Sequence, residues 1–350
     1  MHQNVNRLIG RSLLTLCDAF PQAKRPLQKL GLRTKKEWFG DRVVKAQMPD
    51  GTCIKLASVS RNYLSFELFW RGIGYYEPIS RLVIQELVKP GDTFVDLGAN
   101  IGFYSLAISV TRPEVRVISF EPNPRNYALL SQNARVNGLT NLVCEPIAIS
   151  DRDGTATLYL SASDMSASLR SDFEDHTDGE TVVQTTTLDS YLNYHPVTGQ
   201  LVIKVDVEGH EEAFFRGAQK TLAERQPDII TEVTLNYSRE AVSRLQRLGY
   251  RFYQVTDEGL LEASTLAPKV RDNFVFLNYL ISTKPREEVA RLFQRIAPEV
   301  RKIDLTRTSK CLAWDAVEKF KARSSTVSPA ASAIETEAAP VGAKEPMSVA

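Results

Sequence analysis

Hydrophobic and polar positions along this chain follow two different periods, and the change of period predicts where strands and helices lie. After residue 90, short apolar runs with the length of buried strands are separated by stretches with the three-to-four-residue repeat of an amphipathic helix. The predicted strands are TFVDL, VRVISF, LVCEPIAIS, LVIKVDV, DIITEV, RFYQV and FVFLNYL, and the predicted helices lie near 102–110, 124–137, 210–224 and 238–248. This alternation indicates a doubly wound α/β fold, a mostly parallel sheet with helices on both faces.

The segments outside this pattern predict smaller elements that pack around the sheet. Two alternating runs flank Pro49-Asp50-Gly51, which is typical of a β-hairpin. The end of the chain is too poor in large apolar side chains to form a core. The predicted organisation is a helical segment at 1–40 that caps the core, a hairpin and helical lead-in at 41–89, a Rossmann-like domain at 90–282, a helical segment at 283–322 and a disordered tail at 323–350.

One insertion interrupts the sheet pattern at residues 154–187, where two β-rich segments flank a polar stretch rich in Ser and Asp. Long polar loops on a rigid sheet carry specificity more often than packing. We interpret the insertion as a lid or substrate-facing flap, with a plain surface loop as the alternative.

Composition excludes several function classes. The 350 residues are 43% hydrophobic, and 43 Lys and Arg balance 42 Asp and Glu, so no strong field draws nucleic acid or anionic lipid. The four cysteines are far apart and lack metal-ligand spacing, which predicts reduced thiols and a cytoplasmic location. We expect no signal peptide and no integral membrane segment, because no apolar stretch reaches the roughly 20 residues that span a bilayer. The oligomeric state is left open.

The stretch VDLGANIGFYS carries the first chemical signal. Asp96 ends a predicted strand, and open α/β sheets bind ligands beyond the carboxyl ends of their strands. Gly98 and Gly102 let the backbone approach a ligand closely, and Asn100 tolerates positive φ. No Gly-Lys-Ser/Thr ending follows for phosphates, and the G-x-G-x-x-G dinucleotide pattern is broken. An acidic turn without a cation suits a cofactor with an ammonium and a sulfonium, as in S-adenosyl-L-methionine.

The next two strand ends supply further candidate cofactor contacts. Glu121 lies 25 residues after Asp96, where a doubly wound fold places an acceptor for ribose hydroxyls. Asn123, two residues further on, is included with it. Ser150 and Asp151 end the third run, where a carboxylate could accept a hydrogen bond from an adenine amino group. An ordinary turn around Asp151 is the alternative.

Together these stretches resemble the FkbM family of S-adenosylmethionine-dependent methyltransferases. The similar motifs are VDLGANIGFYSL, FEPNPRNYALLSQNARVNGL, AISDRDGTATLYL, TTTLDSYL and IKVDVEGHEEAFFRGA, in the order of the family, over residues 90–235. The resemblance implies a seven-stranded methyltransferase sheet and methylation of hydroxyl groups on sugars or polyketide-type products. It does not extend to either end of the chain.

The stretch LVIKVDVEGHEEAFF predicts the catalytic groups. Asp206, Glu208 and His210 follow a strand end, so they should cluster near the methyl group of the cofactor. A neutral hydroxyl is a weak nucleophile, so the acceptor must be held in line and deprotonated. Asp206 is the first choice for this role, and His210 has an ordinary surface histidine as its alternative. Lys204 is interpreted as a structural ion-pair partner.

Metal dependence stays open at this point. Glu232 ends the neighbouring strand and could join Asp206 in binding Mg²⁺, but we prefer cofactor-edge carboxylates without a metal and assign no metal ligand. An Asn/Asp-Pro-Pro-aromatic segment, expected for nucleobase amino methylation, is missing from VDVEG, so we expect a small-molecule or glycan acceptor and no nucleic acid. The alternatives are a non-catalytic cofactor-binding or scaffolding protein and a nicotinamide-dependent oxidoreductase.

Overall fold

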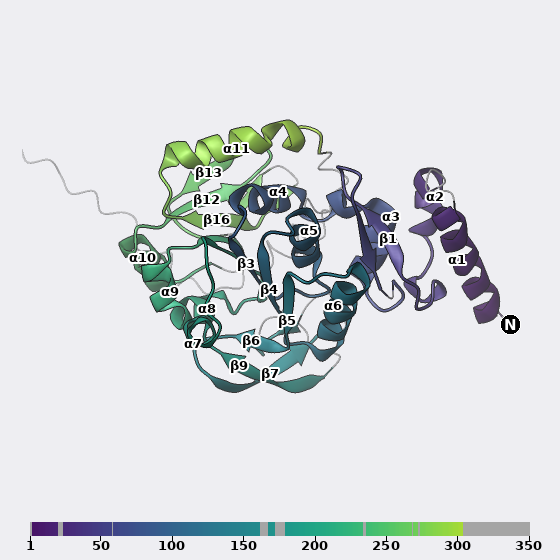
Figure 1. Ribbon diagram of the computed structural model, residues 1–350, viewed down its shortest axis with the longest axis horizontal. Helices are drawn as coiled ribbons and strands as arrows, with labels where there is room; N and C mark the ends of the chain where they lie inside the picture. Colours follow the sequence, from purple (N-terminus) through teal and green to yellow (C-terminus); the bar gives the residue numbers. More distant parts are fainter. Residues whose placement is uncertain are drawn as a thin grey trace, which may run out of the picture.

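An eight-stranded sheet forms the centre of the molecule in the computed structural model (Figure 1). The structure describes residues 2–19, 24–57, 59–161, 167–171, 179–233, 236–267, 269–271 and 274–303. The strand order is β13 (Leu260–Ala263), β12 (Arg251–Val255), β16 (Asn278–Ser282), β11 (Asp228–Glu232), β10 (Leu201–Val205), β3 (Thr93–Leu97), β4 (Arg116–Phe120) and β5 (Leu142–Glu145). Strands from β5 to β11 are parallel, whereas β16, β12 and β13 pair antiparallel.

The predicted doubly wound, mostly parallel α/β fold is confirmed by this sheet and its two apolar faces. Side chains alternate along the strands between two cores, as Phe94 and Val95 do on β3. The strand β13 adds an eighth strand to the seven that the family resemblance implied. It folds back on β12 through a turn in which the Thr256 N–H donates to the Gly259 carbonyl at 3.0 Å.

Helices cover both faces of the sheet (Figure 1). One face packs against α3 (Tyr63–Arg71), α4 (Pro78–Leu87), α5 (Phe103–Thr111), α6 (Pro124–Asn137) and α11 (Arg286–Val300). The other packs against α7 (Leu188–Tyr194), α8 (Glu211–Gly217), α9 (Gln219–Glu224) and α10 (Arg239–Arg247). Side-chain caps mark several helix starts: Asn62, Thr187 and Ser238 each accept a hydrogen bond from a backbone N–H three residues later. The four predicted helices of the domain therefore correspond to α5, α6, α8–α9 and α10.

Two of the predicted strand runs are broken into separate strands. The run LVCEPIAIS divides at Pro146, because proline has no N–H to donate to a ladder. The first half is β5, whereas the second, β6 (Ile147–Ile149), joins a four-stranded sheet with β9 (Glu180–Thr186), β7 (Gly154–Leu160) and β8 (Ala167–Ser168). The run FVFLNYL divides likewise. Its first part, β15 (Phe274–Phe276), pairs with β14 (Lys269–Arg271), and its second part is β16.

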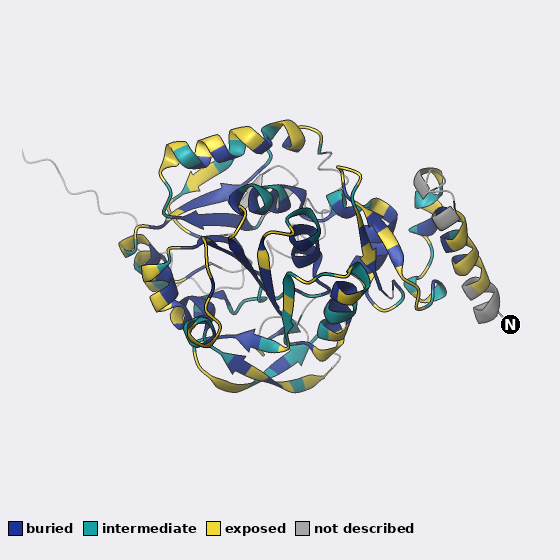
Figure 2. Cartoon of the chain, in the orientation of Figure 1, coloured by how far each residue is buried: buried dark blue, intermediate teal, exposed yellow. Residues whose placement is uncertain are grey.

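The described part of the predicted insertion is this second sheet. It lies below the ends of β3, β4 and β5 in the view of Figure 1, and Figure 2 shows buried positions on its inner side. Leu158 and Val183 form a small core there with Ala148. The insertion thus contains an ordered β-layer next to the strand ends.

The N-terminal segment lies to one side of the central sheet in Figure 1. It comprises α1 (His2–Ala19), α2 (Lys24–Gly31), the 3₁₀ turn η2 (Lys36–Trp38) and the hairpin β1 (Val44–Gln47) and β2 (Cys53–Leu56), followed by α3 and a second 3₁₀ turn, η3 (Ile73–Tyr75). The predicted hairpin around residues 49–51 is confirmed. It is held to α6 by Asn133, whose side-chain oxygen accepts the Ala57 N–H at 2.7 Å, and by Asn137, whose oxygen accepts the Lys55 N–H at 2.8 Å.

The C-terminal helix α11 packs on α4 and exposes its outer face (Figure 2). The predicted tail at 323–350 and the end of the segment 283–322 lie outside the described residues. None of the described helices combines the length and the apolar character needed to cross a membrane.

Candidate active site

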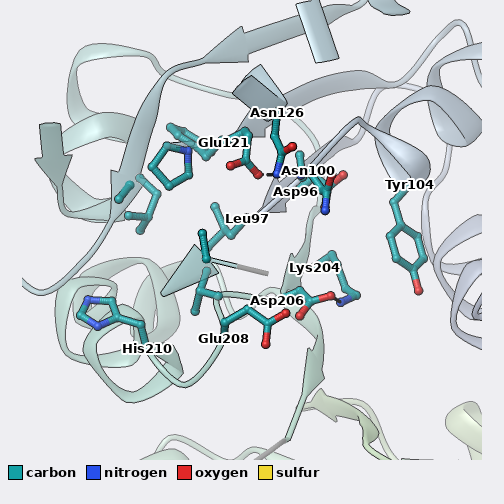
Figure 3. A pocket seen from close by; sticks show the side chains of 18 of the residues that line it. Asp96, Leu97, Asn100, Tyr104, Glu121, Asn126, Lys204, Asp206, Glu208 and His210 are labelled. Carbon is teal, nitrogen blue, oxygen red and sulfur yellow. Dashed lines mark hydrogen bonds and ion pairs between the residues drawn. The ribbon is translucent and has the colours of Figure 1, made fainter. Parts of the chain in front are cut away.

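A pocket opens at the carboxyl ends of β3, β4 and β10 (Figure 3). Parallel strands bring these ends to one edge, which is where doubly wound sheets bind ligands. The insertion covers one side of the pocket through Leu158, Ala167 and Leu169. Seven of the predicted site residues line the pocket: Asp96, Gly98, Asn100, Glu121, Asp206, Glu208 and His210.

The glycine turn after β3 is shaped mainly by packing within the protein. Gly98 has φ of 74°, and a Cβ at this position would lie 1.8 Å from the Asp206 carbonyl oxygen. Gly102 has φ of 90° and precedes α5, and its Cβ would lie 2.6 Å from Leu130 Cδ1. Gly98 does line the pocket, but Gly102 is not among the lining residues. The expectation that both glycines admit a ligand therefore needs correction for Gly102, which admits a core leucine instead.

Asn100 connects the turn to the next strand end. It adopts a left-handed conformation with φ of 51°, as its residue type predicted. Its backbone N–H donates to Glu121 Oε2 at 2.7 Å. The turn is therefore fixed by an acidic side chain of the neighbouring strand as well as by its own backbone.

Asp96 lies at the floor of the pocket and is 2% exposed. Its Oδ2 accepts hydrogen bonds from both the backbone N–H and the hydroxyl of Ser105. Burial raises the pKa of Asp96 to about 6, although the Ser105 hydroxyl and the charge of Lys204 act in the opposite direction. This carboxylate orders the turn between β3 and α5 and adds negative charge beside the cofactor region.

Glu121 is a pocket carboxylate whose orientation is fixed by backbone hydrogen bonds. Its two oxygens accept the N–H groups of Asn100 and Asn123 at 2.7 and 2.8 Å, which fixes its orientation. A carboxylate has about four acceptor positions, so two remain for further donors. Burial raises the pKa of Glu121 to about 7. Such a fixed, buried carboxylate fits the predicted role of accepting paired hydroxyl donors.

Asn123 contributes its backbone to Glu121, whereas its side chain caps α6. Its side-chain oxygen accepts the Arg125 N–H at 3.0 Å, and the residue does not line the pocket. Asn126, one turn into the helix, does line it and lies beside Glu121 and Asn100 in Figure 3. The polar contact that the sequence assigned to Asn123 is thus offered by Asn126, and the N-cap spacing Asn123-Pro124 was the signal that could have shown this.

The predicted adenine contacts of Ser150 and Asp151 are not supported by the geometry. Neither residue lines the pocket: both follow the end of β6, where Ser150 bonds to His210 and Asp151 bonds to Arg216. Asp151 Oδ2 accepts a hydrogen bond from Arg216 at 3.1 Å. Burial raises the pKa of Asp151, but the bonds from Arg152 and Arg216 outweigh it and hold the pKa below its ordinary value. The pocket is lined in this region by Ile147, Ala148 and Ile149 of β6 instead.

Asp206 and Lys204 form an ion pair at the end of β10. Lys204 Nζ lies 3.0 Å from Asp206 Oδ2, and the Lys204 side chain is 1% exposed. The ammonium also lies over the ring of Tyr104, 5.2 Å from the ring centre. The ion-pair role predicted for Lys204 is therefore confirmed, and its partner is the carboxylate predicted to be catalytic.

Glu208 lies in the turn between β10 and α8. Its φ is 51°, a conformation that costs energy for a non-glycine residue and that is found most often at functional sites. The Glu208 carbonyl accepts a hydrogen bond from Ser168 of the insertion at 2.7 Å. This bond connects the insertion directly to the turn after β10.

In Figure 3, His210 lies apart from Asp206, with Glu208 between them. Its Nε2 lies 2.8 Å from the Ser150 hydroxyl, and burial lowers its pKa to about 4. It is therefore neutral at pH 7. Of the three residues expected to cluster, Asp206 and Glu208 lie together in the pocket. His210 lies at the margin of the pocket, where it contacts Ser150.

Two site residues were not predicted from the sequence. Glu77 precedes α4 and has φ of 36°, and its carboxylate accepts a short hydrogen bond from the Tyr104 hydroxyl. Both side chains are buried, and Tyr104 lines the pocket. The only sequence signal at Glu77 was its position before Pro78 at a helix start, which does not distinguish it from a structural residue.

Comparison with known proteins shows the family of this region. Residues 96–252 match the methyltransferase FkbM domain. The 2-O-methyltransferase NoeI of Sinorhizobium fredii is 28% identical over 159 residues, which cover 41% of this chain and 64% of that protein. The hexuronic acid methyltransferase AglP of Haloferax volcanii is 27% identical over 161 residues, 45% of this chain and 63% of that protein.

A crystal structure of the methyltransferase FkbM from Methylobacillus flagellatus is also similar. It has 17% sequence identity and a TM-score of 0.37, and the match covers 64% of this chain and 53% of that one. The chain spans less than two thirds of the length of the relatives it matches here.

Proposed function

Because residues 96–252 are a domain of the FkbM methyltransferase family, we propose that this protein transfers a methyl group from S-adenosylmethionine to a hydroxyl oxygen of a sugar, glycan or small metabolite. The supporting observation is the charge of the pocket. Among the described residues that line the pocket, Lys204 carries the positive charge, and its ammonium is paired with Asp206. A pyrophosphate would meet Asp96 and Glu121 there, whereas an ammonium and a sulfonium suit that charge.

The cofactor is expected to bind along the edge formed by β3 and β4. We assign Glu121 to the ribose hydroxyls, and Asn126 to a polar contact beside it. The apolar residues of β6 and Leu158 would contact the adenine plane. S-adenosylmethionine, when bound, supplies the methyl group, and the protein must position the acceptor and remove its proton.

We assign this task to Asp206, with Glu208 beside it. Methyl transfer forms a carbon–oxygen bond and breaks the carbon–sulfur bond, and the proton of the hydroxyl passes to a base. Lys204 fixes one oxygen of Asp206 and thereby orients the carboxylate. His210 is a positioning residue in this proposal, because Ser150 holds it at the margin of the pocket.

The name of one relative indicates an oxygen acceptor, and the name of a second indicates a sugar acid. NoeI is a 2-O-methyltransferase and AglP is a hexuronic acid methyltransferase. Sugar acceptors carry neighbouring hydroxyl groups, and the acidic strand ends of this pocket can accept hydrogen bonds from them. A small metabolite with the same pattern of hydroxyls would fit the same chemistry.

Two measurements test this proposal. Calorimetric titrations of S-adenosylmethionine and NAD should show binding of the first and none of the second, and NAD binding alone would favour an oxidoreductase. Mass spectrometry of glycans and metabolites from cells with and without the protein should then show an acceptor lighter by about 14 daltons in its absence. Binding of S-adenosylmethionine without any methylated product would instead favour a cofactor-binding or scaffolding protein.

We also propose that the reaction takes place in the cytoplasm. In the described part of the chain, Cys53 and Cys144 are free thiols. Unpaired thiols are typical of a reducing compartment. Fractionation of cells that express the full chain would test this location.

A further inference from the structure

A group of acidic side chains meets at the edge of the sheet where α4 begins. Glu77 precedes α4, Asp206 follows β10 and Glu232 ends β11. One carboxylate oxygen of each lies within 4.8 Å of the other two. Glu77 and Glu232 are each 5% exposed, so this charge is largely removed from water. Three carboxylates this close repel one another, and a divalent cation among them would relieve that repulsion beyond what the bonds from Tyr104 and Lys204 supply.

The spacing suits a single hard cation. Mg²⁺ and Mn²⁺ take oxygen ligands at about 2.1 Å and Ca²⁺ at about 2.4 Å, so opposite ligands of one ion are about 4.2 to 4.8 Å apart. The three carboxylate oxygens of Glu77, Asp206 and Glu232 all lie within 4.8 Å of one another, close enough for one ion to contact all three. They come from three different elements, so the backbone, rather than one flexible loop, holds them at this separation.

A second observation, independent of the acidic groups, comes from Asn278. It is paired with Glu232 in the antiparallel register of β11 and β16, so both side chains project from the same face of the sheet. Asn278 is 8% exposed, and its Oδ1 has no hydrogen-bond partner. An unsatisfied buried carbonyl costs about 1 to 3 kcal/mol. An amide oxygen is also an ordinary ligand of Mg²⁺ and Ca²⁺.

From these two observations we propose that Glu77, Asp206, Glu232 and Asn278 bind one divalent cation of the Mg²⁺, Mn²⁺ or Ca²⁺ type. Taken as ionised, the three carboxylates and Lys204 carry a net charge of −2, which one such ion neutralises. An ammonium is the competing occupant, for example the amino group of the cofactor. It would leave a charge of −1, and its three N–H donors would not serve all four oxygens. A divalent metal ion therefore explains the positions of the four oxygens and their charge better than an ammonium does.

A metal site here differs from the interpretation that the sequence alone favoured. From the sequence, metal binding by Glu232 and Asp206 was left open, and carboxylates at the cofactor edge without a metal were preferred. Glu77 and Asn278 complete the ligand set, and neither was visible from the strand pattern. Both are brought to the edge by the fold, one from the start of α4 and the other from the antiparallel strand β16.

The role of the ion depends on the proposed function, but the binding site itself does not. Asp206 lines the pocket, so a cation that it binds would face the acceptor. Such an ion could hold two neighbouring oxygens of the acceptor and make the attacking hydroxyl easier to deprotonate. The acceptor class that fits is therefore one with vicinal hydroxyls, or a hydroxyl next to a carboxylate.

Mn²⁺ titration of the full chain, followed by electron paramagnetic resonance without cofactor or acceptor, tests the site directly. We expect one bound ion, displaced by excess Mg²⁺ or Ca²⁺. Glu232→Gln keeps the shape of the side chain but removes its charge, and it should weaken Mn²⁺ binding at least about 10-fold. Glu77→Gln should do the same, which guards against one variant failing to fold.

Asp228→Asn is the matched control. Asp228 is a buried acid at the opposite end of the same strand, paired with Lys284 at 2.8 Å, so its loss should leave Mn²⁺ affinity unchanged. The melting temperature of each variant should be recorded alongside. Failure of the wild type to bind any of the three ions at millimolar concentration would overturn the site, as would full affinity in folded Glu232→Gln and Glu77→Gln. Metal binding without methyl transfer would refute the proposed function and leave the site standing.

Discussion

The place of a side chain on Gly98 is occupied by the main chain of Asp206. A Cβ on Gly98 would lie 1.8 Å from the Asp206 carbonyl oxygen, far inside contact distance. The two residues belong to the turns after β3 and β10, which are neighbouring strands of the sheet. Their contact sets the distance between the turn assigned to the cofactor and the carboxylate assigned to the acceptor. Glycine at position 98 is therefore required by the arrangement of the pocket, and not only by its positive φ.

Substitution of Gly98 should disturb both stability and cofactor binding. Gly98→Ala adds a methyl group where there is no space and strains a left-handed residue, so we expect a loss of about 2 to 4 kcal/mol in the free energy of unfolding. Gly138→Ala is the control, since Gly138 has φ of 67° with nothing within 4 Å of a Cβ. It should cost only about 1 kcal/mol. Denaturant unfolding of both variants measures the difference, and equal losses would show that the contact with Asp206 is unimportant.

Replacement of Glu121 should weaken cofactor binding selectively. Glu121→Gln keeps the volume but removes charge-assisted acceptors, so affinity for S-adenosylmethionine should fall about 10-fold or more. Glu211→Gln is a matched control: Glu211 is 4% exposed, burial also raises its pKa to about 7, and it does not line the pocket. Calorimetric titration of both variants distinguishes the two. Unchanged affinity in a folded Glu121→Gln would remove this residue from the binding site.

Cofactor affinity should also depend on pH through Glu121. Because the pKa of Glu121 is raised to about 7, the acid is partly protonated near neutrality, and affinity should rise as pH increases through that value. The sign for stability without cofactor is opposite. The folded state holds the proton of Glu121 more tightly than the unfolded state does. The contribution of Glu121 to the free energy of unfolding therefore falls as pH rises from the ordinary pKa of 4.5 to about 7. Affinity measured at about pH 6 and about pH 8 should differ more for the wild type than for Glu121→Gln, in which only the smaller change from Asp96 remains.

His210 should give the reverse dependence of stability on pH. Burial lowers the pKa of His210 to about 4 from an ordinary 6.5, so below 6.5 the unfolded state takes up a proton more readily than the folded state. Its stabilising contribution is therefore present above 6.5 and is lost as pH falls toward 4, by up to about 3 kcal/mol. His210→Gln can still bond to Ser150 but does not titrate. The stability difference between wild type and variant should shift against the wild type on acidification, and a constant difference would contradict the neutral buried state.

The alternation of apolar strand-like runs with helical repeats was sufficient to predict the central sheet and the residues at its edge. β3 has the bounds of TFVDL, and α6 begins and ends at the predicted residues, because apolar periodicity and caps are local signals. Asp96, Glu121 and Asp206 reach one pocket because parallel strands end on the same side of the sheet. These predictions needed no knowledge of long-range packing.

The errors and omissions arose where residues distant in sequence decide the outcome. Pro146 divided one run between two sheets, and Asp151, beyond the end of the second part, pairs with Arg216 of α8 and does not line the pocket. Glu77 lies 16 residues before Thr93, the first residue of β3, and only packing of α4 on the sheet brings it to Glu232. Asn278 could not be selected because a single buried amide has no periodic signature. Tertiary contacts of this kind determine the side chains that complete a site.

The role of Asp206 can be separated from its structural bond to Lys204. Asp206→Asn should lower turnover about 10²- to 10⁴-fold if the carboxylate positions and deprotonates the acceptor hydroxyl. The same change leaves the ammonium of Lys204, 1% exposed, without its ionic partner. We therefore expect a loss of stability on the order of 2 kcal/mol, since Asp206 itself keeps some contact with solvent. A fall in turnover from the single variant alone would not distinguish catalysis from misfolding.

The double variant Lys204→Met with Asp206→Asn resolves this ambiguity. The double variant also removes the ammonium that has lost the Asp206 carboxylate, and methionine can still pack on Tyr104, so the melting temperature should recover while turnover stays low. S-adenosylmethionine affinity should remain close to that of the wild type in both variants. Recovery of turnover together with stability would show that Asp206 acts only through Lys204 and would end its proposed catalytic role. Recovery of turnover in Asp206→Asn by millimolar Mg²⁺ would instead assign the carboxylate to the cation site, because a weakened ligand set can be refilled by mass action.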